Sequence, residues 1–233
     1  MAIYANRRGR RALHPVRDLV FTPEVRGMFR ENYTLEGKTE VERGQYGNAE
    51  NFFHAAIEQA EEIGLLTPGL ADSLNELAIL YAKQHKYERA ERIFQRSLGV
   101  AVAALGPEHP EVATILKNIG ILKTFQKQFD EADLLLGRSL SLATRILGDE
   151  HPTVAVTMRT IALFQAVQEH YGEAERLIRC SLEIAEKTLG SEHPEVAVSR
   201  KVFAQVVCAG RRNTEKHQTA TRVQDESRIC CGS

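Results

Sequence analysis

The chain has 233 residues, of which 43% are apolar and 26% charged, the composition of an ordinary globular protein. Aromatic residues make up 6% and tryptophan is absent, which favours packed helices rich in alanine, leucine, isoleucine and valine over a β-sandwich. The formal net charge of −1 excludes the chain as a whole from the general polyanion binders.

Residues 1–22 are predicted to form a basic, disordered arm. Its arginines are Arg7, Arg8, Arg10, Arg11 and Arg17. They occupy the place of the apolar block of a secretory signal, so we expect a cytoplasmic protein. The arm leaves open an alternative function, a nucleic-acid-associated repeat protein, because clustered arginines attract phosphates. However, no aromatic residues alternate with these arginines to stack on bases, which favours a solubilising arm.

A 42-residue period runs through the chain from Pro68 to Ala209. An aromatic residue followed three positions later by alanine recurs at Tyr87, Phe129 and Tyr171. The linker Leu-Gly-x-Glu-His-Pro recurs with its proline at Pro110, Pro152 and Pro194. Agreement at so many positions is the signature of a repeat architecture, in which each repeat is one structural unit.

Each repeat is predicted to contain two helices. The first begins at a proline, which is favoured in the first turn because its missing N–H would lack a partner there. The second begins at the aromatic residue and ends at a glycine, the usual residue just beyond a helix end. Small residues recur where the two helices come close. In the first helices they are Ala78, Gly120, Ala162 and Ala204, and in the second helices Ala90, Ala132 and Ala174.

The period defines the expected domain organisation. A helical-repeat domain spans residues 23–209, between the arm at 1–22 and a polar, disordered tail at 210–233. Its repeats are expected at residues 23–66, 68–107, 110–149 and 152–191, followed by a capping helix at 194–209. The first of these repeats is a diverged copy whose linker lacks the Glu-His pair. The capping helix should cover the apolar face of the last repeat.

The combination of a small residue, an aromatic residue, Glu-Ala-Glu and Ser-Leu resembles the tetratricopeptide repeat, whose usual unit is about 34 residues. The 42-residue unit with Leu-Gly-x-x-His-Pro-x-Val-Ala resembles the repeats of kinesin light chain and nephrocystin-type proteins. The resemblance implies an all-α solenoid of antiparallel helical hairpins wound as a right-handed superhelix. It also implies a protein-interaction scaffold or adaptor that binds a peptide or partner domain in a concave groove.

The candidate partner-binding residues lie at two repeat positions of the first helices that, in family members, face this groove. The first position, held by Asn75, Lys117, Arg159 and Lys201, is predicted to form a basic stripe. The second, one turn later, is held by Lys38, Ile79, Ile121, Leu163 and Gln205, a mostly apolar floor. A partner with acidic and apolar residues would fit, because lysine and arginine bind carboxylates through charge-assisted hydrogen bonds. The alternative reading is a solvated helix face.

Other chemistry has little support in the sequence. The histidines of the three Glu-His-Pro linkers are isolated, so no metal site is expected. No catalytic motif appears, and Cys180 and Cys208 fall in apolar patterns typical of small core residues. We therefore expect no enzyme, cofactor or small-molecule substrate. Cys230 and Cys231 leave open a membrane-tethered adaptor, although the residues after them fit a prenylation signal poorly.

Overall fold

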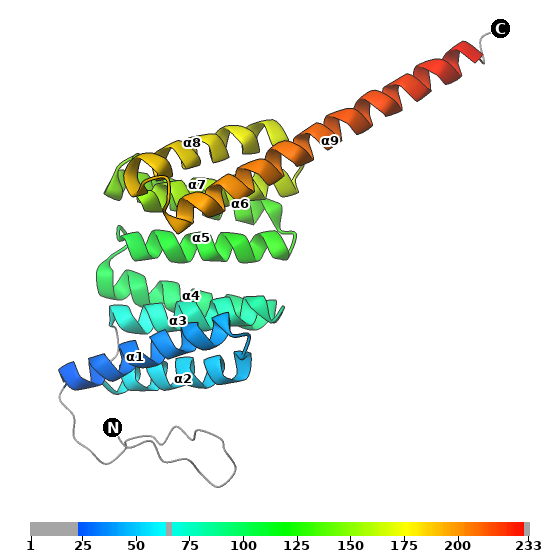
Figure 1. The fold of residues 1–233 in the computed structure, drawn as a ribbon. Coiled ribbons are helices and arrows are strands. Elements are labelled where there is room, and N and C mark those ends of the chain that lie inside the picture. The colour runs from blue at the N-terminus through cyan, green and yellow to red at the C-terminus, as the bar shows by residue number, and fades with distance from the viewer. Residues whose placement is uncertain (1–22, 64–66, 231–233) are drawn as a thin grey trace. The chain divides into compact units, whose positions relative to one another are not determined.

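The computed structural model describes residues 23–63 and 67–230, and gives side chains for residues 31–61 and 67–215. The predicted arm at residues 1–22, linker residues 64–66 and Cys231 lie outside this description. Every regular element in the described ranges is a helix (Figure 1). The helices are α1 (Pro23–Glu42), α2 (Tyr46–Ile63), α3 (Pro68–Lys83), α4 (Tyr87–Leu105), α5 (Pro110–Phe125), α6 (Phe129–Leu147), α7 (Pro152–Val167), α8 (Tyr171–Leu189) and α9 (Pro194–Cys230).

The chain divides into two compact units, unit 1 (Met1–Ala104) and unit 2 (Leu105–Ser233). Unit 1 contains the hairpins α1/α2 and α3/α4, with α3 packed on both helices of the first hairpin. Unit 2 contains the hairpins α5/α6 and α7/α8, and α9 packs on α8 and α7. The predicted all-α fold of helical hairpins with a closing helix is therefore confirmed.

Close approach of the two helices in a hairpin depends on the predicted small residues. Ala78 and Ala162 have no exposed surface, and glycine stands at the same position in the other two hairpins. A Cβ atom on Gly120 would lie 2.7 Å from Leu136 Cγ, and one on Gly37 would lie 2.5 Å from the Phe53 ring. The α1/α2 and α5/α6 hairpins therefore require glycine at this position, because a Cβ atom would overlap Phe53 or Leu136 and force the core to shift.

A serine in the second helix joins the two helices of three hairpins. Ser97, Ser139 and Ser181 are buried, and each hydroxyl donates to an alanine carbonyl oxygen of the first helix at 2.7–2.8 Å. The acceptors are Ala71, Ala113 and Ala155. The recurring Ser-Leu pair of the sequence thus has a structural role, since a buried hydroxyl needs a partner.

The Glu-His-Pro linkers of unit 2 start the helices that follow them. The Nδ1 atoms of His109, His151 and His193 accept the backbone N–H of the residue two positions later at 3.1–3.2 Å. Each histidine thus caps a helix whose first residue is proline, a role that the sequence reasoning missed. In unit 1, the Thr67 hydroxyl caps α3 by accepting the N–H of Leu70, three positions later. The linker acid Glu108 pairs with Arg145 of α6 at 2.7 Å.

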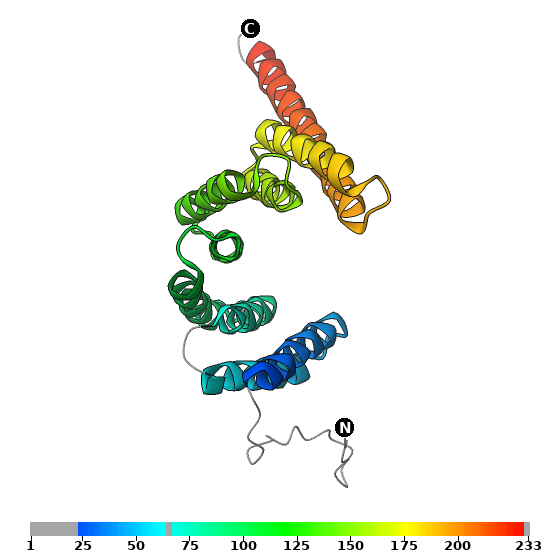
Figure 2. The ribbon, with the colours of Figure 1, turned by 90° about the vertical axis from the view of Figure 1, so that its left-hand side faces the viewer.

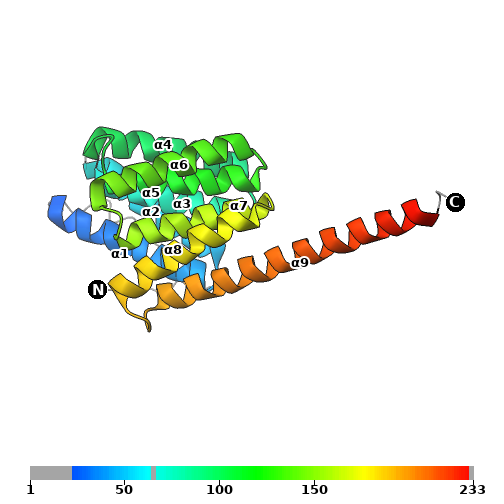
Figure 3. The same cartoon turned by 90° about the horizontal axis from the view of Figure 1, so that it is seen from above.

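Helix α9 departs from the predicted organisation. The expected helix end at Ala209 is wrong, because α9 continues to Cys230 and gives residues 210–230 a helical backbone (Figure 3). The tail has no proline, and after Gly210 it is rich in residues compatible with helix. Val196, Val202 and Val206 are buried as a cap requires.

Residues on one side of α9 are more exposed than the sequence predicts. Ala204 is exposed, whereas its counterparts in the hairpins are buried, because α9 runs on past α8 and has no second helix folded back on it within the described residues (Figure 2). Cys208 is exposed for the same reason. Cys180 is also exposed, at the repeat position held by Arg96 and Arg138, so placing these cysteines in the core was wrong.

Candidate functional site

The predicted binding positions fall in both units. Lys38, Asn75 and Ile79 belong to unit 1, on α1 and α3. Lys117 and Ile121 lie on α5 of unit 2, Arg159 and Leu163 on α7, and Lys201 and Gln205 on α9. We call the surface that carries Lys117, Arg159 and Lys201 the cationic face. Within unit 2 the first helices that carry this face pack side by side, α5 on α7 and α7 on α9.

In unit 1 the charges at these positions are neutralised within the chain. Lys38 Nζ lies 3.1 Å from Glu76 and 3.9 Å from Asp72. Burial lowers the pKa of Lys38, but the two carboxylates outweigh it and the pKa ends above its ordinary value of 10.5. Burial raises the pKa of Glu76, and Lys38 opposes that rise. Asn75 is buried, so it offers little surface to a partner.

Arg159 has a carboxylate of its own in unit 2. Its Nη2 atom lies 2.8 Å from Oε2 of Glu195, in the first turn of α9. Its Nη1 atom donates to the Ser199 hydroxyl at 3.0 Å and to the Glu195 carbonyl oxygen at 3.3 Å. Only 13% of the side chain is exposed, so Arg159 is largely a link between α7 and α9 and only partly a free cation.

Lys117 occupies the same repeat position as Arg159 but has no such partner. Its Nζ atom makes no hydrogen bond or ion pair with any residue that the structure describes. Burial and the neighbouring Arg159 lower the pKa of Lys117, and Glu195 only partly offsets them. The residue 42 positions before Glu195 is Thr153, which has no charge. A half-buried ammonium group is therefore held beside a second cation without its own carboxylate.

Exposed apolar side chains adjoin the cationic face. Ile79 and Ile121 are partly exposed and Leu163 is 42% exposed, whereas Gln205 interrupts the apolar floor on α9. One turn beyond Ile121 and Leu163 stand Phe125 and Val167, which are 60% and 59% exposed. We call Ile121, Phe125, Leu163 and Val167 the apolar patch. The sequence reasoning missed Phe125 and Val167, although their 42-residue separation could have identified them.

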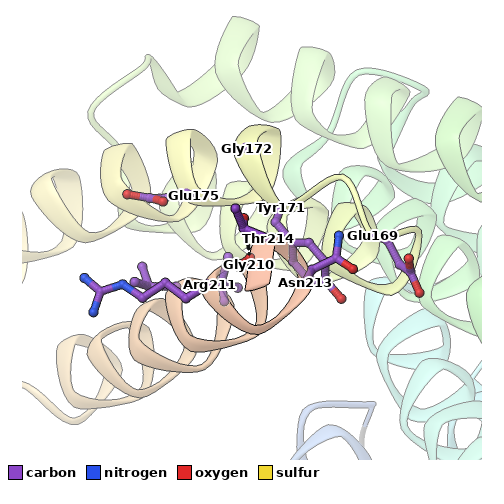
Figure 4. Close-up of a pocket in the computed structure, with 10 residues that line it drawn as sticks. Glu169, Tyr171, Gly172, Glu175, Gly210, Arg211, Asn213 and Thr214 are labelled. Carbon is purple, nitrogen blue, oxygen red and sulfur yellow. Dashed lines mark hydrogen bonds between the residues drawn. The ribbon is translucent and has the colours of Figure 1, made fainter. Parts of the chain in front are cut away.

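A cavity of about 460 Å³ lies elsewhere in unit 2, where α9 passes the start of α8 (Figure 4). Gly210 permits this passage, because a Cβ atom there would lie 3.1 Å from Tyr171 Cβ. Thr214 donates back to the Gly210 carbonyl oxygen at 3.0 Å. Glu169, Glu175 and Arg211 line the cavity but bring mixed charge and no cluster of ligands. Indeed, the described residues include no group of acids, cysteines and histidines that could hold a metal ion.

Together, the fold and this surface define a helical-hairpin repeat protein whose first helices carry a candidate binding face. The chain belongs to the tetratricopeptide repeat family, because sequence profiles of this repeat match residues 33–101, 69–144 and 154–195. Among curated proteins, no sequence matches the chain. Within the described ranges, no helix is both long enough and apolar enough to cross a membrane.

Solved structures show the same fold at low sequence identity. BtubC (BKLC) from P. vanneervenii is 18% identical with a TM-score of 0.68, over 91% of this chain and 84% of that one. A Podosopora anserina protein, a putative kinesin light chain with nearly identical TPR-like repeats, is 21% identical with a TM-score of 0.63, over 92% and 100%. A Rap protein complexed with Competence and Sporulation Factor is 15% identical with a TM-score of 0.67, over 88% and 54%.

Proposed function

We propose that the chain is a protein-interaction scaffold that binds an acidic, partly apolar segment of a partner protein on the first helices of unit 2. The tetratricopeptide fold is typical of such scaffolds, because its stacked hairpins create extended binding surfaces. One structural neighbour, the Rap protein, is complexed with a separate factor. These similarities support the class of function, and the chemistry of unit 2 supports the kind of partner.

The unpaired ammonium group of Lys117 is the observation that carries the proposal. A buried charge is costly unless it is paired, and the lowered pKa of Lys117 reflects that cost. Arg159, one repeat later, shows what the position accepts, namely a carboxylate at 2.8 Å. The partner's Asp or Glu side chain would give Lys117 the interaction that Glu195 gives Arg159. Lys201, exposed on α9, adds a further cation to the same face.

Thr153 offers a direct test, because Thr153→Glu would supply the missing carboxylate from within the chain. Glu111 and Glu195 hold the same repeat position, and their N–H groups donate to the linker histidines as that of Thr153 does. Glutamate is therefore compatible with this helix start. We expect Thr153→Glu to weaken binding of an acidic peptide about tenfold or more by competing for Lys117. Lys117→Met should weaken it to a similar degree.

The probe would be a fluorescent peptide enriched from a random display library on the full chain, with affinity followed by anisotropy. We expect enriched peptides to combine an acidic residue with a bulky apolar one. Ser141→Glu, at an exposed position of the second helix α6 and outside the first helices, is the control for a general negative charge and should have the smaller effect. Enrichment of basic peptides, or equal affinity for the parent, Thr153→Glu and Lys117→Met, would contradict the proposal.

A further inference from the structure

We infer that the apolar patch, Ile121, Phe125, Leu163 and Val167, receives a bulky apolar side chain of the same partner segment, three or four residues from the carboxylate that binds Lys117. This inference rests on the proposed function, and it adds a second contact and the spacing between the acidic and apolar residues of the partner segment. Phe125 and Val167 are 60% and 59% exposed at equivalent repeat positions, and Leu163 is 42% exposed beside them, and grouped exposure of this kind is typical of interaction sites.

The patch and the cationic face lie on the same two helices. Ile121 follows Lys117 by four residues and Phe125 follows by eight, so all three lie on one side of α5. Leu163 and Val167 repeat this arrangement relative to Arg159 on α7, and α7 packs on α5. The two helices therefore present an apolar end and a cationic end in the same order.

The helix geometry fixes the separation of the two contacts. Eight residues of α-helix rise about 12 Å, which is the distance along α5 between Lys117 and Phe125. An extended peptide covers about 3.3 Å per residue, so about three or four residues span this distance. The partner segment should therefore hold its acidic and apolar residues at that spacing, lying along α5 and α7.

Charge complementarity favours an acidic partner segment over a second copy of this chain. Pairing two copies through the patch with their helices parallel would bring Lys117 and Arg159 of each copy close to those of the other, and an antiparallel pairing would leave Lys117 of each copy without a carboxylate. Like charges in an interface are unfavourable, and Glu195 already pairs with Arg159 in each copy. A segment with an acid beside its apolar residue covers the patch and neutralises Lys117 together.

A double substitution tests the apolar contact. Phe125→Ser with Val167→Ser should weaken binding of the enriched acidic peptide about tenfold, because the peptide's apolar side chain loses its buried surface. The matched control is Leu134→Ser on α6, which removes a side chain that is 74% exposed and lies outside the first helices. That control should leave the affinity unchanged, and circular dichroism should show that both variants remain folded.

Synthetic peptides with zero to six serines between one glutamate and one phenylalanine test the spacing. We expect the strongest binding with two or three serines, because these place the two residues three or four positions apart. If Lys117→Met weakens binding but the double substitution does not, this inference is wrong and the proposed function stands. If neither Lys117→Met nor the double substitution weakens binding, both this inference and the proposed function are wrong. A constant affinity across the series, or a concentration-dependent dimer that the double substitution abolishes, would refute the inference alone.

Discussion

Units 1 and 2 are built from the same helical hairpin with the same buried serine, but the lysines on their first helices differ in ion pairing. In unit 1 the ammonium group of Lys38 has two carboxylates, Glu76 and Asp72, within 4 Å. In unit 2 Lys117 has none among the described residues, and its pKa is lowered by burial. Repeat packing determines only the hairpin core, so polar positions on the first helices can differ from repeat to repeat.

This difference separates structural charges from functional ones. A charge that is neutralised within its own unit stabilises the fold, and binding a partner there would require breaking an existing pair. A charge left without a partner opposes folding and gains from binding. Sites that reduce stability in this way are common where function requires them. The comparison therefore supports our proposal that the partner binds unit 2, and it favours a structural role for Lys38.

The largest effect is expected on the free energy of unfolding, and it tests whether the two units unfold independently. Leu136 is 1% exposed and packs against Phe164 and Ile161 in unit 2. Leu136→Ala should reduce the free energy of unfolding of unit 2 by about 2–5 kcal/mol, because the core would contain a cavity. Hydrogen exchange should quicken in α5–α7 and stay unchanged in α1–α3. Equal quickening in both units would show that they unfold as one.

An intermediate effect is expected at the helix starts. His151→Ala in unit 2 and Thr67→Ala in unit 1 should each reduce stability by about 1 kcal/mol, because each removes the acceptor for a backbone N–H group. Urea unfolding of the two variants would measure this. His151→Asn should keep most of the stability, since asparagine also caps helices well. If His151→Ala leaves the free energy of unfolding unchanged, the imidazole acceptor contributes nothing to stability.

The smallest effects should have opposite signs in the two units. Lys38→Met should reduce stability, because the raised pKa of Lys38 shows that its charged form favours the folded state. Lys117→Met should increase stability at neutral pH, because the lowered pKa shows that the charged form of Lys117 opposes folding.

The pH dependence separates charge from added apolar surface in these two variants. The contribution of Lys38 is complete below its ordinary pKa of 10.5 and is lost only above it, so the cost of Lys38→Met should persist as the pH rises from 7 toward 10.5. The penalty from Lys117 disappears over the same rise, because the folded protein releases that proton first. Urea unfolding across this range should therefore show the gain from Lys117→Met shrinking, and a constant gain would contradict the charge argument.

Much of the fold was predictable because it depends on features that repeat in the sequence. The prolines, the small residues and the aromatic starts of the second helices each reflect a local requirement, and the helices begin where these residues predict. The continuation of α9 was not predictable in the same way. Asn213 replaces the aromatic residue that starts each second helix, but only the structure shows that the helix continues instead of turning.

The candidate site was only partly accessible to sequence reasoning. The period placed Lys117 and Arg159 at one position, but it could not show that Glu195 pairs with Arg159 while Thr153 leaves Lys117 without a carboxylate. Such pairing depends on which helices lie side by side and on side-chain direction. The binding role of all the predicted groove residues remains a prediction, and our proposal concerns those of unit 2.

The most direct test of the account is the affinity of one acidic, apolar peptide for Lys117→Met and Lys38→Met, measured side by side by anisotropy. The two variants remove the same charge and add the same side chain at positions on first helices of different units. We predict that Lys117→Met weakens binding about tenfold or more, whereas Lys38→Met leaves it within about twofold of the parent. Equal losses in the two variants would contradict the assignment of binding to unit 2.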